Sequence, residues 1–232
     1  MQRFFLDSNK LEFSIDELAF LLKITAEDTV WIDMIKSILD KSMDQLAIEA
    51  CWQSFDKQNF HFPENNLQIG KHTLAVGKKI KMEIIHASAI VVYLCTAGKE
   101  IESFSKKLME NGDVFEAYIV DMIGSLAVEK ATELLQAEVS RSISNMKHSI
   151  RFSPGVCGWN IENQKALFNV FEGHPIPVQL NDSHLMMPLK SVSGIWAIGE
   201  QFETGKYACD LCDSESCMYR SLIQFKLEKQ KV

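Results

Sequence analysis

An arginine and a backbone turn lie next to each other at residues 151–155, which read RFSPG. The Pro154-Gly155 pair predicts a turn, because proline fixes φ and glycine permits a positive φ. The proline also pushes Ser153 toward extended geometry, so the backbone groups of Ser153 can be offered to a ligand. The guanidinium of Arg151 is a planar fork that fits a carboxylate. These residues taken alone favour the simpler interpretation of a plain turn beside a surface arginine.

A single carboxylate interrupts the apolar face of the helix expected over residues 113–147. Four apolar residues at helical spacing form this face: Phe115, Ile119, Met122 and Leu126. Glu129 continues the same face three residues further on. A carboxylate in this position needs a partner, because burying an unpaired charge is costly. The simpler interpretation is a boundary glutamate that reaches solvent or pairs with a nearby lysine.

Three cysteines near the C-terminus form a C-x2-C-x4-C pattern, namely Cys209, Cys212 and Cys217. Thiols at this spacing can bind zinc or an iron–sulfur cluster, with Cys157 or a carboxylate as the fourth ligand. The alternatives are reduced thiols without a metal, or a redox disulfide, and the acidic residues among the cysteines oppose thiolate formation. Nothing in the pattern indicates a catalytic role.

The common catalytic motifs are absent from the sequence. It contains no Walker loop and no GxGxxG, GxSxG or HExxH pattern, and its six histidines form no pair at metal-ligand spacing. In the segment MMPLKSVSG, residues 186–194, the side chains of Lys190, Ser191 and Ser193 would suit an anion or would be solvated. These patterns therefore assign no reaction.

Helical patterning predicts the elements of the N-terminal part. A first helix is expected over residues 14–23, capped by Ser14 with Glu17 at the capping-box position. A second helix is expected over residues 26–50, where apolar residues recur at helical spacing. A turn-rich connection follows, so the first 60 residues are expected to form a helical segment.

The remaining residues predict a mixture of strands and helices. Residues 89–95 are β-prone and apolar throughout, which predicts a central strand buried on both faces. Shorter strands are expected at residues 178–180 and 192–196, with Gly194 as a bulge or a point of close approach. Further helices are expected at three places: residues 99–110, 113–147 and 162–171.

Composition indicates a folded protein that acts away from nucleic acid and membranes. Of its 232 residues, 47% are hydrophobic and 24% are charged, which is ordinary for a domain with a substantial core. The net charge of −7 disfavours binding to nucleic acid phosphates. The most apolar run, residues 84–98, is too short to span a bilayer. Half of the six cysteines lie within nine residues, unlike a secreted disulfide framework, so we expect a cytoplasmic protein with reduced thiols.

Five segments form a set when they are taken in order along the chain. They are ASAIVVYLCTAGKEIE (87–102), GSLAVEKATELL (124–135), RFSPGVCGW (151–159), MMPLKSVSG (186–194) and the C-x2-C-x4-C-x-Y-R ending. Together they resemble the activation domain of cobalamin-dependent methionine synthase in its stand-alone form. The resemblance covers about residues 70–221. The family usually has a tyrosine where this chain has Val156.

The resemblance implies a binding site for S-adenosylmethionine. The family's binding arginine corresponds to Arg151, for the carboxylate of the ligand, and the small residue that offers backbone atoms corresponds to Ser153. Gly155 belongs to the same turn. The helix glutamate corresponds to Glu129, which would meet the amino group of the ligand or offset its positive charge. A tyrosine contact late in the domain corresponds to Tyr207.

The resemblance also implies a task for the domain. The domain would hold S-adenosylmethionine and present its methyl group to an inactive, oxidised corrinoid, while a flavodoxin-type donor supplies an electron. We expect an α+β fold with a twisted antiparallel sheet and flanking helices over residues 61–232, preceded by the helical segment over residues 1–60. The expected function is reactivation of a cobalamin-dependent methionine synthase or methyltransferase on a separate protein, within methionine biosynthesis.

Two other functions remain open at this point. The first is a metal- or iron–sulfur-bearing redox or sensor module that kept the fold and lost the ligand. The second is an interaction subunit that only docks on a methionine synthase core. The first depends on the cysteines near the C-terminus, and the second on surfaces that the sequence does not identify.

Overall fold

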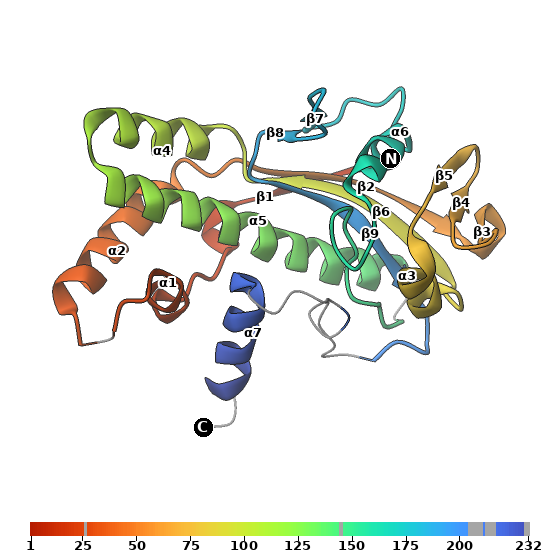
Figure 1. The fold of residues 1–232 in the computed structure, drawn as a ribbon, viewed down its shortest axis with the longest axis horizontal. Helices are drawn as coiled ribbons and strands as arrows, with labels where there is room; N and C mark the ends of the chain where they lie inside the picture. Colours follow the sequence, from red (N-terminus) through yellow and green to blue (C-terminus); the bar gives the residue numbers. More distant parts are fainter. Residues whose placement is uncertain (26, 144–145, 204–210, 212–216, 230–232) are drawn as a thin grey trace.

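A four-stranded sheet forms the centre of the computed structural model, which describes residues 1–25, 27–143, 146–203, 211 and 217–229 (Figure 1). All neighbouring strands in this sheet are antiparallel. The strand order is β1 (Gln2–Leu6), β2 (Ile48–Asp56), β6 (Ala89–Thr96) and β9 (Ser191–Ile198). The expected α+β fold with an antiparallel sheet and flanking helices is confirmed.

Two small sheets and ten helical elements complete the described part of the chain. The small sheets consist of β3 (Phe60–His61), β4 (Leu67–Ile69) and β5 (His72–Leu74), and of β7 (Gln179–Leu180) and β8 (Met186–Met187). The α-helices are α1 (Ile15–Leu22), α2 (Thr29–Met43), α3 (Gly77–Ile84), α4 (Glu100–Asn111), α5 (Val114–Ile143), α6 (Gln164–Asn169) and α7 (Met218–Lys229). Short 3-10 turns are η1 (Ser8–Lys10), η2 (Lys57–Asn59) and η3 (Ile161–Asn163). No helix among the described residues is long and apolar enough to cross a membrane.

Strand β6 separates two hydrophobic cores. All eight of its residues are buried, as the uninterrupted apolar run predicted. Alternate side chains point to opposite faces of a strand, so Val91, Tyr93 and Cys95 join one core and the residues between them join the other. The first core also contains the apolar faces of α1, α2 and α5, and the second contains α3, α6 and the small sheet β3–β5 (Figure 1).

The long helix α5 lies along one face of the sheet (Figure 1). Its buried side chains recur at helical spacing from Ala117 to Ser140, and they pack on α2, α4 and the sheet. Helix α7 packs against α1 on the same side of the sheet, with the rings of Phe20 and Phe225 stacked at 4.4 Å between centroids. This arrangement places the middle of α5 between the sheet and the helices α1 and α7.

The expectation of an all-helical N-terminal segment is wrong in one respect. The helix expected over residues 26–50 ends at Met43, and residues 48–56 form strand β2. Strand β2 pairs along its whole length with β6, and β1 pairs in turn with β2. The spacing of Leu46 fits a helix, but pairing between distant parts of the chain overrides that local pattern. Residues 1–60 therefore supply half of the central sheet as well as α1 and α2.

A short extended segment after α5 continues the sheet beyond β9. Phe152 and Ile195 exchange both backbone hydrogen bonds, each 2.9 Å long, and Ser149 N–H donates to the carbonyl of Ala197. Gly194 is the point of close approach that the sequence predicted. A Cβ atom at this position would lie 2.3 Å from the carbonyl oxygen of Phe152 and 3.0 Å from the Tyr93 hydroxyl. The absence of a side chain at Gly194 therefore allows residues 151–153 to lie over the sheet edge.

Candidate functional site

The turn predicted at Pro154-Gly155 is present and is held by backbone hydrogen bonds. The N–H of Val156 donates to the carbonyl of Ser153 over 3.1 Å, and Gly155 has a φ of +93°, which favours glycine. The N–H of Gly155 donates to the carbonyl of Trp159, while that of Ser153 takes no part in these turn bonds. The turn thus holds Ser153 in place directly after Arg151, with one backbone donor left outside its hydrogen bonds.

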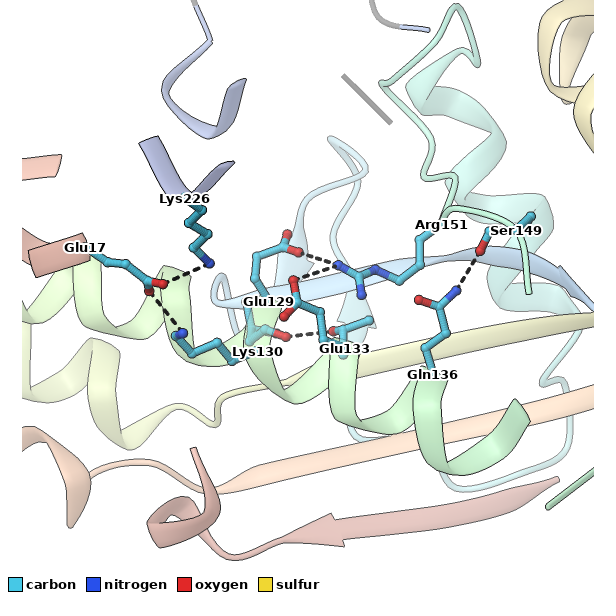
Figure 2. A network of polar contacts seen from close by, with 10 residues as sticks. Glu17, Glu129, Lys130, Glu133, Gln136, Ser149, Arg151 and Lys226 are labelled. Carbon is cyan, nitrogen blue, oxygen red and sulfur yellow. Dashed lines mark hydrogen bonds and ion pairs between the residues drawn. The ribbon is translucent and has the colours of Figure 1, made fainter. Parts of the chain in front are cut away.

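Arg151 and Glu129 face each other across the gap between this turn and α5. The guanidinium nitrogen Nη2 of Arg151 lies 3.1 Å from Oε2 of Glu129 and 3.9 Å from Oε1 of Glu133 (Figure 2). Both partners of the shorter pair are partly buried, with 18% of the Arg151 side chain and 31% of the Glu129 side chain exposed. The two residues that the sequence singled out therefore share one site.

The position of Glu129 follows from the helical spacing of α5. Leu126, Ala131 and Thr132 around it are buried, and the carboxylate emerges where this buried face meets the edge of the sheet. Glu133 lies one turn further along α5, and residues four apart share a helix face. The partner of Glu129 is thus an arginine instead of a lysine, and part of the glutamate side chain still reaches solvent. Glu133 was not foreseen, although its i+4 spacing from Glu129 is visible in the sequence.

Burial and charge act against each other at this pair. Burial raises the pKa of Glu129, and the nearby Arg151 cation opposes that rise. Burial disfavours the charge of Arg151, but the carboxylates of Glu129 and Glu133 favour it, and its pKa lies above the ordinary value. The guanidinium therefore stays charged, and its partner carboxylate is easier to protonate than an exposed glutamate.

Glu17 on α1 forms ion pairs with residues of α5 and α7. Its partner on α5, Lys130, directly follows Glu129. One of its carboxylate oxygens lies 3.0 Å from Nζ of Lys130 on α5, and the other lies 3.1 Å from Nζ of Lys226 on α7 (Figure 2). The side chains of Glu17 and Lys130 are mostly buried. Ser14 accepts a hydrogen bond from the N–H of Glu17, as expected for the helix cap, but the Glu17 side chain is used for these ion pairs instead of a capping box.

The segment MMPLKSVSG does not present a cation for an anionic ligand. Lys190 Nζ lies 2.7 Å from a carboxylate oxygen of Asp121 and donates to the Ser125 hydroxyl over 2.9 Å. Ser191 and Ser193 are buried, and the hydroxyl of Ser191 donates to the carbonyl of Pro188. This lysine thus fastens the start of β9 to α5.

Three of the predicted site residues lie outside the described part of the chain: Tyr207, Cys209 and Cys212. Cys217 is described, is half-buried and forms no disulfide. Within the described residues no group of three histidine, cysteine or acidic side chains is placed to hold a metal ion. Metal binding by the three cysteines stays a prediction.

A separate apolar hollow of about 510 Å³ lies at the start of α5. It is lined by residues of α4 and α5, among them Met109, Phe115 and Tyr118. Asp121, the lining residue nearest in sequence to Glu129, precedes it by eight positions, or roughly 12 Å along a helix. The hollow therefore does not include Arg151 or Glu129, and its lining offers apolar contact more than polar recognition.

Comparison with known proteins agrees with the resemblance of the sequence motifs. The family model described as vitamin B12 dependent methionine synthase, activation domain, matches residues 64–218. The fold is similar to that of a solved structure described as the MetH reactivation domain bound to AdoHcy, with a TM-score of 0.63 and 16% sequence identity over 87% of this chain and 79% of that one. A search of curated proteins gave no match. Because the family model spans well over half of its residues, the chain belongs to the family of the activation domain of vitamin B12-dependent methionine synthase.

Proposed function

We propose that the chain binds S-adenosylmethionine and supports reductive remethylation of a corrinoid carried by a separate methionine synthase or methyltransferase. The pairing of Arg151 with Glu129 is the observation that carries this proposal. The similar solved structure, described as bound to AdoHcy (S-adenosylhomocysteine), adds support, because that ligand has the same amino-acid end as S-adenosylmethionine.

The amino-acid end of the ligand complements the two charges. It carries a carboxylate and an ammonium group on one carbon, and Arg151 and Glu129 offer a cation and an anion about 3 Å apart. When the ligand enters between them, its carboxylate replaces Glu129 beside Arg151 and its ammonium replaces Arg151 beside Glu129. The exchange keeps every buried charge paired, so it avoids the cost of an isolated buried ion.

The turn after Arg151 supplies further contacts in this proposal. The N–H of Ser153 is outside the hydrogen bonds of the turn, so it can donate to the ligand. Gly155 and Val156 are exposed at the turn, where they leave room for the rest of the ligand. The two turns at residues 153–159 hold these groups in place before the ligand arrives, which lowers the entropy cost of binding.

The task of this chain is to hold and aim the methyl donor. The corrinoid accepts the methyl group once a flavodoxin-type donor has reduced its metal, and that chemistry belongs to the cofactor. Arg151 and Glu129 fix the amino-acid end of the ligand, so the methyl group on its sulfonium can be presented outward to the partner protein. The Arg151–Glu129 pair is partly exposed, which leaves the ligand a route from solvent.

Calorimetric titration with S-adenosylmethionine and AdoHcy tests this proposal. We expect Arg151→Ala to weaken binding at least about 30-fold, because it removes a charge-assisted contact and leaves Glu129 without its cation. Arg141→Ala is the matched control, since the exposed Arg141 side chain donates a hydrogen bond to the carbonyl of Ala137 within its own helix. An absence of binding by the wild-type chain, or equal binding by the Arg151→Ala variant, contradicts the proposal.

A further inference from the structure

The hydroxyl of Tyr93 is buried beside the Arg151–Glu129 pair without a hydrogen-bond partner among the described residues. Tyr93 lies in the middle of β6, and its side chain is fully buried in the core between the sheet and α5. Buried hydroxyl groups in proteins are nearly always hydrogen-bonded, because the loss of water otherwise has no compensation. A buried hydroxyl of this kind calls for a physical explanation.

The tyrosine ring is held in one place by its neighbours. The Trp196 ring packs against it at 4.9 Å between centroids, and Gly194 lies opposite Tyr93 in the register of β6 and β9. The phenol oxygen would lie 3.0 Å from a Cβ atom at Gly194, and the Phe152 carbonyl oxygen crowds the same point. The glycine therefore leaves space for the hydroxyl beneath the segment that carries Arg151.

The hydroxyl is electrostatically coupled to the charges of the candidate site. Burial raises the pKa of Tyr93 well above its ordinary value, Arg151 opposes the rise, and Glu129 adds to it. The nearby side chain of Ser153 lowers that pKa, but its geometry is not that of an ordinary hydrogen bond, so the phenol oxygen has no hydrogen-bond partner within the part of the chain that the structure describes. The phenol is thus a neutral group that can donate a proton in a hydrogen bond next to a guanidinium.

We infer that Tyr93 is a ligand-binding residue whose hydroxyl donates a hydrogen bond to the carboxylate of S-adenosylmethionine, once the ligand has parted Arg151 from Glu129. This inference rests on the proposed function and adds a residue that the sequence motifs did not identify. Arg151 attracts the ligand carboxylate to a position beside the buried phenol, where the carboxylate can accept the hydrogen bond of the phenol. The phenol makes the site selective for the zwitterionic end of the ligand over an uncharged one.

The Tyr93→Phe variant tests the inference, because it removes the hydroxyl and keeps the ring against Trp196. We expect its dissociation constant for AdoHcy to rise about tenfold or more, as for a lost hydrogen bond to a charged group. Its affinity for 5′-methylthioadenosine should not change, since that ligand lacks the amino-acid end. The melting temperature without ligand should stay the same or rise, because the variant removes a buried polar atom that lacks a partner.

Tyr118→Phe is the matched control, because Tyr118 lies half-exposed at the start of α5 and loses the same atom. Tyr118→Phe should leave the affinity for both ligands and the melting temperature unchanged. If the wild-type chain binds AdoHcy and Tyr93→Phe binds it equally well, the inference fails while the proposed function stands. An equal loss for both ligands would show a general distortion and would also overturn it. If the wild-type chain binds neither ligand, both ideas fail.

Discussion

Replacing Gly194 by alanine tests how the candidate site is built. The added Cβ atom would lie 2.3 Å from the carbonyl oxygen of Phe152, and the Tyr93 hydroxyl is the next obstacle at 3.0 Å. The first contact is with backbone, so the segment carrying Arg151 has to move away from β9. That movement strains the two hydrogen bonds between Phe152 and Ile195.

The expected loss of stability is about 3 kcal/mol, at the upper end of the usual cost of overfilling a well-packed interior. For a chain of this size that loss lowers the melting temperature by roughly 6–12 °C. Differential scanning calorimetry measures the change, and AdoHcy binding should weaken in the same variant because Arg151 is displaced. Gly199→Ala is the control, since the atoms nearest to the added Cβ there belong to the flexible end of the Gln201 side chain. A Gly194→Ala variant that melts and binds like the wild type would refute the close approach.

Two further predictions concern the charged groups along α5. Because burial raises the pKa of Glu129, the carboxylate that binds the ammonium group should become protonated at a higher pH than an exposed glutamate, so affinity for AdoHcy should fall as the pH is lowered from neutral into the acidic range. The Glu129→Gln variant should bind weakly with a flat pH profile, and a wild-type affinity independent of pH would contradict this role. Glu17→Gln should lower the free energy of unfolding by about 1–2 kcal/mol and speed hydrogen exchange in α7, because the carboxylate joins Lys130 to Lys226. Asp33→Asn, at an exposed ion pair, should change neither quantity. Unaltered exchange in α7 would show that Glu17 does not hold this helix.

Features that depend on residues close together along the chain could be predicted from the sequence. The cap at Ser14, the turn at Pro154-Gly155 and the buried strand over residues 89–95 are confirmed. Each follows from local chemistry: a hydroxyl that accepts from a helix N–H, a proline with fixed φ followed by a glycine that permits a positive φ, and an uninterrupted apolar run. The carboxylate on the apolar face of α5 was visible for the same reason, because helical spacing alone places Glu129 there.

Features that depend on pairing between distant parts of the chain were harder to predict. Residues 48–50, at the start of strand β2, fell within the helix expected over residues 26–50, and only the pairing of β2 with β6 reveals the strand. The partner of Lys190 lies on α5, far from it in sequence. Tyr93 looked like one more core residue of an apolar strand, and its role near Arg151 depends on Gly194 about a hundred residues later. Such contacts have no local signature, so the structure was needed to find them.

A crystal structure of the chain with AdoHcy tests the central claim most directly. We predict that the 3.1 Å contact between Arg151 and Glu129 is broken in the complex, with the ligand carboxylate beside the guanidinium and the ligand ammonium beside the Glu129 carboxylate. A complex in which the ligand lies elsewhere and the ion pair remains intact would contradict this binding mode.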